Sequence, residues 1–202
     1  MHLFALLLSS VHGEFSASPS ILCRAFHLKS FSFLQRGTVK EFCVFVARTS
    51  AAKSQPGTRC SVTQDQFVVH CYHMSDGLVA TAITDAEYPP RAAFFTLKDA
   101  VSAFRQTHAE TWKDQGTRRD REFKLSDLKP LLADRQDPRS FDPLIRAASA
   151  TDEVIEVMND NLQLALSRGE QLDELVGRSE DLSRRAKLFY KESKGKRCCD
   201  LM

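Results

Sequence analysis

A seven-residue repeat of small and apolar residues runs through the C-terminal part of the chain. Alternate steps of three and four residues from Leu144 stay in register to Phe189, over more than six heptads. No proline occurs from residue 144 to residue 202, and that stretch holds only three glycines. Residues at this spacing line one side of a helix, so the pattern predicts a coiled-coil helix that buries its seam against other helices.

Further apolar residues flank this seam, at Ile155, Leu162, Leu166 and Val176. They make the apolar stripe too wide for a simple two-stranded coiled coil, so we expect a larger bundle or two alternative partners. Around its centre the seam consists of Val154, Met158, Asn161, Ala165, Arg168, Leu172, Leu175, Ser179, Leu182, Ala186 and Phe189.

Arg168 is the charged residue of this seam. A charge in a helical core costs stability unless it is paired and hydrogen-bonded. A register shift would move Arg168 outside, but the spacing is unbroken from Ala165 before it to Leu172 after it. A polar core residue can specify register and partner, and glutamine carbonyl oxygens from partner helices would satisfy the five N–H donors of the guanidinium group.

This helix is expected to be only marginally stable alone. Gly169 and Gly177 each cost about 1 kcal/mol relative to alanine inside a helix. Asn161 and Ser179 weaken the apolar seam further. We therefore expect the segment to order when partner helices supply the rest of the core.

The first 110 residues alternate between strand-like and helix-like patterns, which favours an α+β domain. Turn signals lie at Pro56-Gly57 and Ser75-Asp76-Gly77, where glycine supplies the positive φ that tight turns need. The N-terminal segment resembles a signal peptide, but its apolar run is six residues long and no Lys or Arg precedes it, so we favour a strand. We expect strands at 2–11, 20–28, 58–64, 66–74 and 78–85, and helices at 32–51 and from Pro89-Pro90.

Residues 110–143 predict a connection between two parts of the chain. The polar stretch TWKDQGTRRDREFK is expected to be a loop, followed by a short helix broken at Pro130 and a linker at 136–143. We therefore predict a domain at 1–136, a coiled-coil segment at 137–197 and a tail at 198–202. No run of 18 apolar residues that could span a membrane occurs.

Several classes of protein are not indicated. The net charge of +2 gives no overall bias toward nucleic acid. We find no nucleophile–base constellation, paired carboxylate motif or metal-ligand spacing, so we expect no catalytic residue, no metal and no dissociable cofactor. The C-terminal cysteines would also suit a small prenylated GTPase, but that class needs a phosphate-binding glycine loop, which the sequence lacks. Cys23, Cys43, Cys60 and Cys71 are predicted to be buried core thiols rather than a disulfide framework.

Arg168 at the centre of the repeat, followed by GEQLDELVGRSEDL and AKLFYK, resembles an R-SNARE motif. The resemblance implies that this helix joins three glutamine-bearing SNARE helices in a parallel four-helix bundle whose zippering drives membrane fusion. Arg168 would then form the central ionic layer. The layers before it would be Val154, Met158, Asn161 and Ala165, and those after it Leu172, Leu175, Ser179, Leu182, Ala186 and Phe189.

The sequence ends in KRCCDLM, which fits the C-a-a-X form for attachment of a prenyl group. Terminal methionine favours farnesyl on Cys199, although Asp200 departs from the aliphatic residue of that form. Cys198 would carry palmitoyl or a second prenyl group, because one lipid gives only marginal attachment. The seven Lys and Arg between Arg184 and Arg197 add attraction to an anionic membrane.

SFSFLQRGTVKEF, GTRCSVTQDQF and DAEYPPRAAF resemble the N-terminal domain of lipid-anchored longin-domain R-SNAREs. The resemblance implies a longin (profilin-like) five-stranded antiparallel sheet with flanking helices. It also implies action on the cytoplasmic side of Golgi, endosomal and vacuolar membranes, and a soluble closed form in which the longin domain covers the SNARE segment and the lipid. Phe42 and Phe45 match the face of the longin domain that covers the SNARE segment in that form; the alternative is that both are ordinary core residues of the domain. The alternative function is a lipidated longin adaptor or inhibitory SNARE that does not promote fusion.

Overall fold

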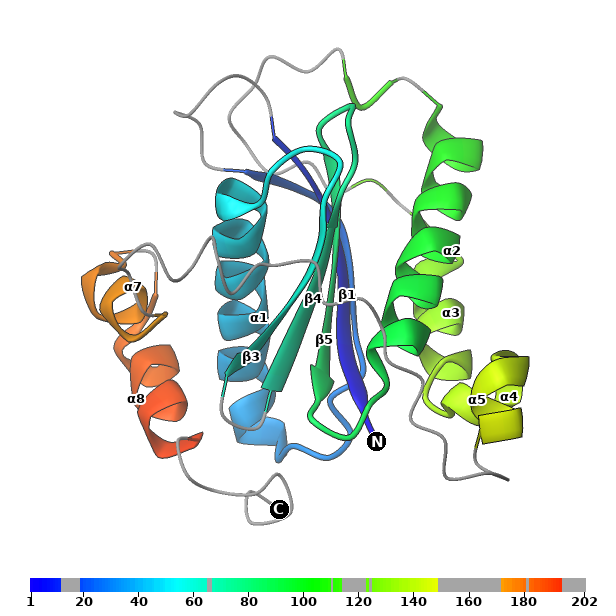
Figure 1. Ribbon diagram of the computed structural model, residues 1–202. Coiled ribbons are helices and arrows are strands. Elements are labelled where there is room, and N and C mark those ends of the chain that lie inside the picture. The colour runs from blue at the N-terminus through cyan, green and yellow to red at the C-terminus, as the bar shows by residue number, and fades with distance from the viewer. Residues whose placement is uncertain are drawn as a thin grey trace.

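Figure 1 shows the computed structural model, which describes residues 1–11, 19–64, 67–109, 111–113, 123, 125–148, 172–180 and 182–193. Five strands form one sheet in the order β2-β1-β5-β4-β3, and every neighbouring pair is antiparallel. The five-stranded antiparallel sheet that the sequence implied is therefore confirmed. The strands are β1 (Leu3–Ser10), β2 (Ser20–Phe26), β3 (Arg59–Gln64), β4 (Phe67–His73) and β5 (Leu78–Asp85).

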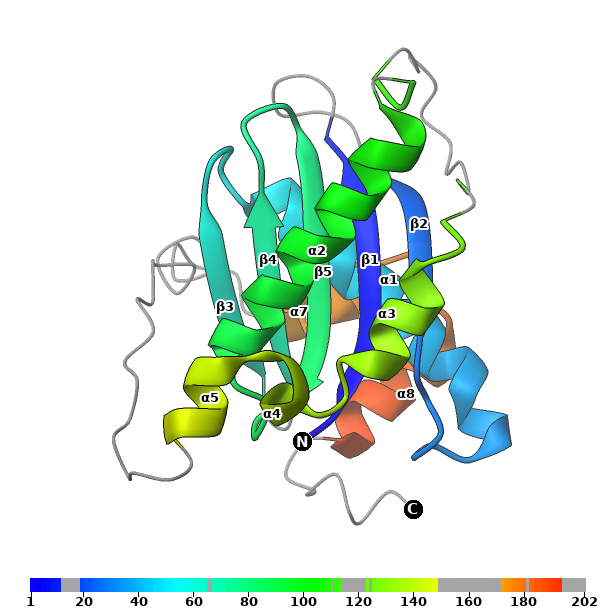
Figure 2. The ribbon, with the colours of Figure 1, turned by 90° about the vertical axis from the view of Figure 1, so that its right-hand side faces the viewer.

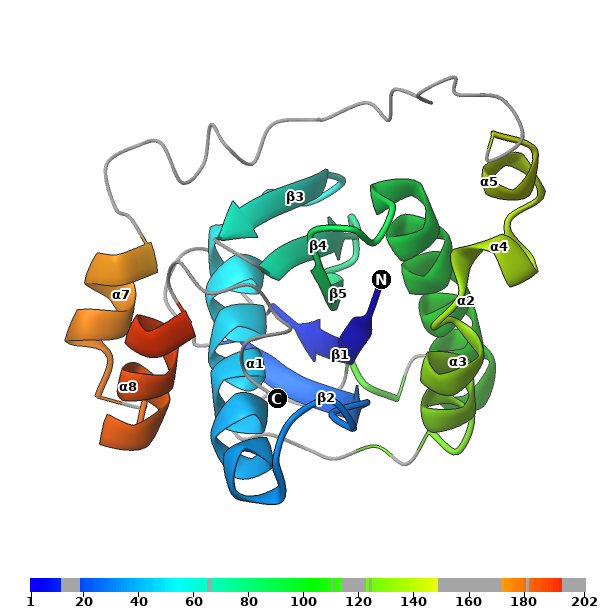
Figure 3. The ribbon, with the colours of Figure 1, turned by 90° about the horizontal axis from the view of Figure 1, so that it is seen from below.

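Helices cover both faces of this sheet. Helix α1 (Phe33–Lys53) covers one face, and α2 (Pro90–His108) and α3 (Leu128–Asp134) cover the other, as Figure 2 shows. The view from below in Figure 3 shows α7 (Leu172–Arg178) and α8 (Arg184–Ser193) outside α1. The short helices α4 (Pro138–Phe141) and α5 (Pro143–Ala148) lie at the opposite side of the molecule.

Alternation along β1 explains why the sheet needs cover on both faces. Phe4 and Leu7 pack in the apolar cluster beneath α1, whereas Leu3, Leu6 and Leu8 pack in the cluster beneath α2 and α3. All eight residues of β1 are buried, and the strand pairs with β2 on one side and β5 on the other. The N-terminal segment is thus a strand, as predicted, and the sheet order makes it an inner one whose apolar run belongs to the domain core.

Glycine conformations confirm the two predicted turns. Gly57 has a φ of 80° and Gly77 a φ of 85°. A Cβ atom on Gly77 would lie 2.7 Å from the carbonyl oxygen of Val11, whereas one on Gly57 would meet no atom within 4 Å. The four cysteines of the domain, Cys23, Cys43, Cys60 and Cys71, are buried free thiols, which also agrees with the sequence prediction.

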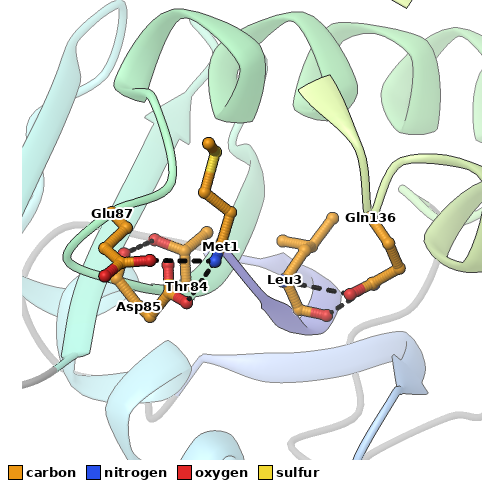
Figure 4. A network of polar contacts seen from close by, with 6 residues as sticks. All are labelled: Met1, Leu3, Thr84, Asp85, Glu87 and Gln136. Carbon is orange, nitrogen blue, oxygen red and sulfur yellow. Dashed lines mark hydrogen bonds and ion pairs between the residues drawn. The ribbon is translucent and has the colours of Figure 1, made fainter. Parts of the chain in front are cut away.

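The segment that follows α3 is fastened to the domain, and two predictions about it were wrong. Pro130 does not break the short helix, because it lies in the first turn of α3, where a missing N–H has no helical partner to lose. Residues 136–143 are not a free linker. Figure 4 shows the Gln136 amide bonded to the backbone of Leu3, with Nε2 donating to the Leu3 oxygen at 2.8 Å.

One ion pair adds to this attachment, and two further ion pairs lie near it at the N-terminus. The buried carboxylate of Asp142 accepts from Arg91 Nε on α2 at 2.9 Å. The amino group of Met1 lies 3.3 Å from Asp85 and 3.1 Å from Glu87, beside the same end of β1 (Figure 4). Residues 136–142 therefore belong to the folded domain. Among the residues that the structure describes, no helix combines the length and the apolar character needed to cross a bilayer.

Candidate functional site

The candidate site is the contact between α8 and α1. Phe42 of α1 is only 4% exposed, because aromatic rings from α8 cover it. The ring centroid of Phe42 lies 5.5 Å from that of Tyr190 and 6.1 Å from that of Phe189. Phe31, just before α1, contacts Phe189 from the other side at 6.2 Å. The ring of Phe189 is thus held between two aromatic side chains of the N-terminal domain.

Seam residues of the heptad repeat, just before α8 and along it, form the face that docks on α1. Leu182, Ala186 and Phe189 follow the predicted four- and three-residue steps, and all three are buried. Arg184, Arg185 and Leu188 of the same helix are exposed. Seam residues therefore enter the core cluster beneath α1. The described C-terminal members of this cluster are Val176, Leu182, Ala186, Phe189 and Tyr190.

A polar contact fixes the beginning of α8. Ser183 Oγ donates to Glu41 Oε2 at 2.8 Å, and the Ser183 backbone N–H donates to the same carboxylate. The Ala186 N–H donates to Ser183 Oγ at 3.2 Å, so Ser183 caps the helix. The Glu41 carboxylate lies where the helix dipole favours negative charge. One side chain of α1 thus stabilises both the position and the start of α8.

Helix α7 is held beside α8 by a second polar contact. Lys187 Nζ donates to the carbonyl oxygen of Gly177 at 3.0 Å. Val176 is buried in the α1 cluster, whereas Leu175 and Ser179 are half-buried. The predicted groove residue Phe45 is half-buried and packs against the same cluster as Phe42.

The described parts of the predicted coiled-coil segment 137–197 do not form one continuous helix in this conformation, and its assembly with partner helices stays a prediction. The described parts form the separate helices α4, α5, α7 and α8, and α7 ends at Arg178 before α8 begins at Arg184. Gly177 and Ser179 are weak helix formers at that end, and Ser183 caps a new helix. The interruption lets both short helices turn apolar residues toward α1.

The structure places only part of the predicted site. Leu172 begins α7, and Leu175, Ser179, Leu182, Ala186 and Phe189 lie along α7, α8 and the turn between them. The remaining predicted site residues, Val154, Met158, Asn161, Ala165, Arg168, Cys198 and Cys199, lie outside the described residues.

Sequence reasoning missed three contributors to the contact, namely Phe31, Tyr190 and the Glu41–Ser183 pair. Tyr190 lies next to a seam position and Phe31 lies just outside the predicted helix, so periodicity gives no reason to select either. Ser183 before a helical run is a start signal that could have been recognised. Its partner Glu41 is 142 residues away, and nothing local links the two.

Buried titratable groups in the described domain are arranged for stability rather than reaction. His70 has Nδ1 2.8 Å from Ser61 Oγ and Nε2 3.1 Å from Thr84 Oγ1. Burial lowers the pKa of His70 to about 4 and raises the pKa of the Cys43 thiol to about 12. His70 is therefore neutral near pH 7 with both ring nitrogens satisfied, and the buried thiol is not activated. No metal-binding group of His, Cys, Asp or Glu occurs among the described residues.

Comparisons with known proteins match both parts of the chain. The Longin family model, described as a regulated-SNARE-like domain, matches residues 28–126, and the Synaptobrevin model matches residues 144–198. The chain is 35% identical over 187 residues to the synaptobrevin homolog ykt6 of Schizosaccharomyces pombe, covering 92% of this chain and 93% of that protein.

Two further relatives cover the chain to a similar extent. The synaptobrevin homolog YKT6 of Eremothecium gossypii is 36% identical over 182 residues, which is 90% of each chain. The VAMP-like protein YKT61 of Arabidopsis thaliana is 34% identical over 203 residues and covers all of both chains. These similarities extend across the longin sheet and the heptad repeat together.

Proposed function

Because this chain belongs to the ykt6-like family of longin-domain synaptobrevin homologues, and is thus an R-SNARE of membrane trafficking and not an enzyme, we propose how it acts. Membership implies interaction with glutamine-SNARE partners. We propose that the heptad repeat within the predicted segment 137–197 zippers with three such helices into a parallel four-helix bundle that drives membrane fusion. Arg168 would provide the central layer, where partner glutamines satisfy its donors.

The observation that carries this proposal is the burial against α1 of Leu182, just before α8, and of Ala186 and Phe189 on one face of α8. These residues occupy consecutive seam positions, which a four-helix bundle would also bury. One apolar face cannot pack against α1 and against three partner helices at the same time. We propose that the longin domain is autoinhibitory, so that bundle assembly requires release of α8 from α1.

Release of α8 from α1 requires breaking the α1–α8 contact, which is smaller than a domain core. Each large side chain fully buried from water contributes about 1.5–3 kcal/mol. Phe189 and Tyr190 are the largest side chains that α8 buries, and the Glu41–Ser183 hydrogen bonds are exposed to solvent. A contact of this size can favour the closed form and still be displaced by a long bundle interface.

Membrane attachment completes the proposal. We propose farnesyl on Cys199 and palmitoyl or a second prenyl group on Cys198, with the adjacent lysines and arginine adding attraction to anionic lipid. Two lipids would give stable attachment and one would give reversible attachment. We propose the cytoplasmic side of Golgi, endosomal and vacuolar membranes as the place of action, in exchange with a soluble closed pool.

Circular dichroism of residues 137–197, alone and with three glutamine-SNARE helices, tests the fusion role. Helicity should rise sharply on mixing, and Leu172→Asp in the seam should abolish the rise. Leu188→Asp is the matched control, because Leu188 lies off the seam and is exposed on α8. If mixing leaves helicity unchanged, the seam serves the longin domain alone, and the alternative of a non-fusogenic longin adaptor or inhibitory SNARE replaces this proposal.

A further inference from the structure

One pair of thiols is an exception among the buried titratable groups of the domain. Cys60 of β3 and Cys71 of β4 lie directly opposite each other in the antiparallel register. Cys60 is 3% exposed and Cys71 is 1% exposed, and both are free cysteines. Cys60 Sγ donates to the carbonyl oxygen of Cys71 at 3.3 Å, and the two thiols also lie within hydrogen-bond reach of each other. We call these two residues the cross-strand dithiol.

A disulfide between the two cysteines needs only a small movement. Side chains directly opposite in an antiparallel pair have Cβ atoms about 4.5–5.5 Å apart, whereas a disulfide joins Cβ atoms about 3.5–4.5 Å apart. Strand β3 is the last strand of the described sheet and has β4 as its neighbour there, as Figure 2 shows. An edge strand can approach its neighbour without disturbing a strand on its other side. The register is therefore already set for a bond within one chain.

The surroundings of Cys71 favour its thiolate form. Hydrogen bonding between the two thiols lowers the pKa of Cys71 and raises the pKa of Cys60, so Cys71 loses its proton first. Burial opposes this effect at Cys71, but the hydroxyl groups of Ser54 and Thr81 add to it, and the pKa of Cys71 stays below its ordinary value. Because the thiolate is the nucleophilic form of cysteine, Cys71 is the member of the pair that attacks.

Thr81 places an unused donor beside Cys71. It lies opposite Cys71 on β5, across β4 from Cys60. Thr81 is fully buried, and among the described residues its hydroxyl has no hydrogen-bond partner of ordinary geometry. A buried hydroxyl without a partner costs stability. Negative charge on the Cys71 sulfur would give this hydroxyl a strong acceptor, so the position suits a thiolate.

The other two buried thiols lack these features. Burial raises the pKa of Cys23 and that of Cys43 to about 12. Cys23 lies opposite Leu8 in the sheet, and Cys43 lies on α1. Both should remain thiols under conditions that oxidise a thiolate, and they serve as internal controls.

We propose that the cross-strand dithiol is a redox modification site, which a hydroperoxide converts into a disulfide between β3 and β4. The Cys71 thiolate attacks one peroxide oxygen and the O–O bond breaks. Cys71 becomes a sulfenic acid, and an alcohol leaves, or water in the case of hydrogen peroxide. The Cys60 sulfur then attacks the Cys71 sulfur, the S–O bond breaks and water leaves. Two electrons pass from the two sulfurs to the peroxide, and the two thiol protons leave in the products.

The disulfide fastens the edge of the sheet. It closes a short loop of chain between β3 and β4, which lowers the conformational entropy of the unfolded state and resists opening of this hairpin. Two molecules of a reducing thiol, which become joined to each other as a disulfide, restore both cysteines. The modification is thus reversible, as expected of a redox-sensitive site in a reducing compartment.

Oxidation of the full chain with Cys198→Ser and Cys199→Ser tests this site, because four cysteines then remain. The folded protein is treated with hydrogen peroxide, and its remaining thiols are counted by mass after unfolding in a maleimide reagent. Two thiols should be lost from each chain, and the mass should fall by that of two hydrogen atoms. A peptide map should join Cys60 to Cys71, and dithiothreitol should restore both thiols.

Three variants assign the roles within the pair. Cys60→Ser should abolish the disulfide and leave Cys71 as a sulfenic acid that dimedone traps. Cys43→Ser is the matched control, because it removes a buried thiol on α1 and should leave the loss of two thiols unchanged. Thr81→Val keeps the shape of the side chain and removes its hydroxyl, so it should slow disulfide formation about threefold.

Several results would overturn the proposal. Simultaneous loss of all four thiols would mean that oxidation follows unfolding of the domain. A disulfide between two chains, or survival of all four thiols at peroxide concentrations that oxidise free glutathione, would also contradict it. A comparison that needs no variant in the domain is the urea midpoint, which should be higher for the oxidised than for the reduced parent. Equal midpoints would contradict the fastening of β3.

This site is separate from the proposed fusion role, because Cys60 and Cys71 lie in the sheet and outside the heptad repeat. Cys60→Ser should therefore assemble with glutamine-SNARE helices as the parent does. Absence of the disulfide with normal assembly would contradict the dithiol alone, whereas failure of assembly in the parent would contradict the fusion role alone.

Discussion

The ring of Phe42 on α1 stacks on the ring of Tyr190 on α8, with centroids 5.5 Å apart and planes inclined by 26°. Phe42 belongs to the longin domain and Tyr190 to the SNARE segment, so this pair joins the two parts matched by separate families. Phe42 also contacts Phe67 of β4, which ties the contact to the sheet. The α1–α8 contact, which we propose defines a closed state, is thus continuous with the domain core.

Tyr190→Ala should open the closed state. Tyr190 is 3% exposed and lies off the heptad seam, so its loss removes contacts with Phe42 and no bundle layer. We expect the closed state to be weakened by about 2 kcal/mol, which raises the open fraction about thirtyfold. Hydrogen exchange of α8 amides should report faster opening in the variant, with bundle assembly unimpaired.

Phe189→Ala is the contrasting variant, because Phe189 is both a seam residue and a contact of Phe31 and Phe42. It should open the closed state and also weaken the bundle, seen as a lower melting temperature of the assembled complex. Equal hydrogen exchange of α8 in wild type and both variants would show that these rings do not hold the closed state.

Ser183→Asp should release α8 through charge repulsion. The added carboxylate would face Glu41, whose oxygens now accept from the Ser183 hydroxyl and N–H. Like charges at such a distance destabilise an exposed contact by about 1 kcal/mol, and salt reduces the effect. The hydrodynamic radius should increase. Glu41→Lys in the same chain should restore the compact form, and failure of this rescue would show that the pair does not couple α8 to α1.

Alanine substitutions at two turn glycines should differ in cost. Gly57→Ala should destabilise the domain by about 1 kcal/mol, because only its positive φ is strained. Gly77→Ala has a similar φ and adds a Cβ atom 2.7 Å from the Val11 oxygen, so it should cost about 3 kcal/mol. Urea denaturation measures both. Equal midpoints would show that the Val11 backbone moves away without cost.

Acidification should destabilise the domain before carboxylates titrate. Burial lowers the pKa of His70 to about 4, and the pKa values of His27 and His73 are also lowered by burial. Below about pH 6.5 an unfolded chain protonates His70 and the native chain does not until about pH 4, so stability falls as the pH decreases from about 6.5 toward 4. His70 alone contributes up to about 3 kcal/mol across this window.

The free energy of unfolding of His70→Gln, measured from about pH 7.5 to about pH 4.5, checks this sign. The free energy of unfolding of the variant should depend less steeply on pH than that of wild type, whatever its value near pH 7.5. Parallel curves for the two proteins would mean that His70 has the same pKa in the native domain as in the unfolded chain, which contradicts the lowered pKa.

The sequence allowed the sheet and the heptad seam to be predicted because each rests on a local period, whereas docking of the seam on α1 was implied only by the family resemblance. Residues close together in the sequence are enough to predict three features. These are the apolar run of β1, the turns at Gly57 and Gly77, and the heptad spacing of Leu182, Ala186 and Phe189. The structure places the last three against α1 through the same face that the repeat defines.

Other features depend on partners distant in sequence, and periodicity could not predict them. The Glu41–Ser183 contact joins residues 142 positions apart, and the Arg91–Asp142 ion pair joins residues 51 positions apart. The interruption between α7 and α8 arises because the longin surface competes with helix continuity, which a repeat alone does not encode. The prediction that Pro130 breaks the helix failed for a simpler reason. Proline is tolerated in the first turn of a helix, and the sequence pattern placed the start of this helix too early.

Energy transfer between dyes at Gly37→Cys and Leu188→Cys tests the central claim most directly, because both positions are exposed and flank the α1–α8 contact. The chain would carry Cys198→Ser and Cys199→Ser, and its other cysteines are buried. We predict high transfer in the free chain and its loss when three glutamine-SNARE helices assemble on residues 137–197. Persistence of high transfer in an assembled four-helix complex would contradict the claim that closure and zippering compete for one face of α8.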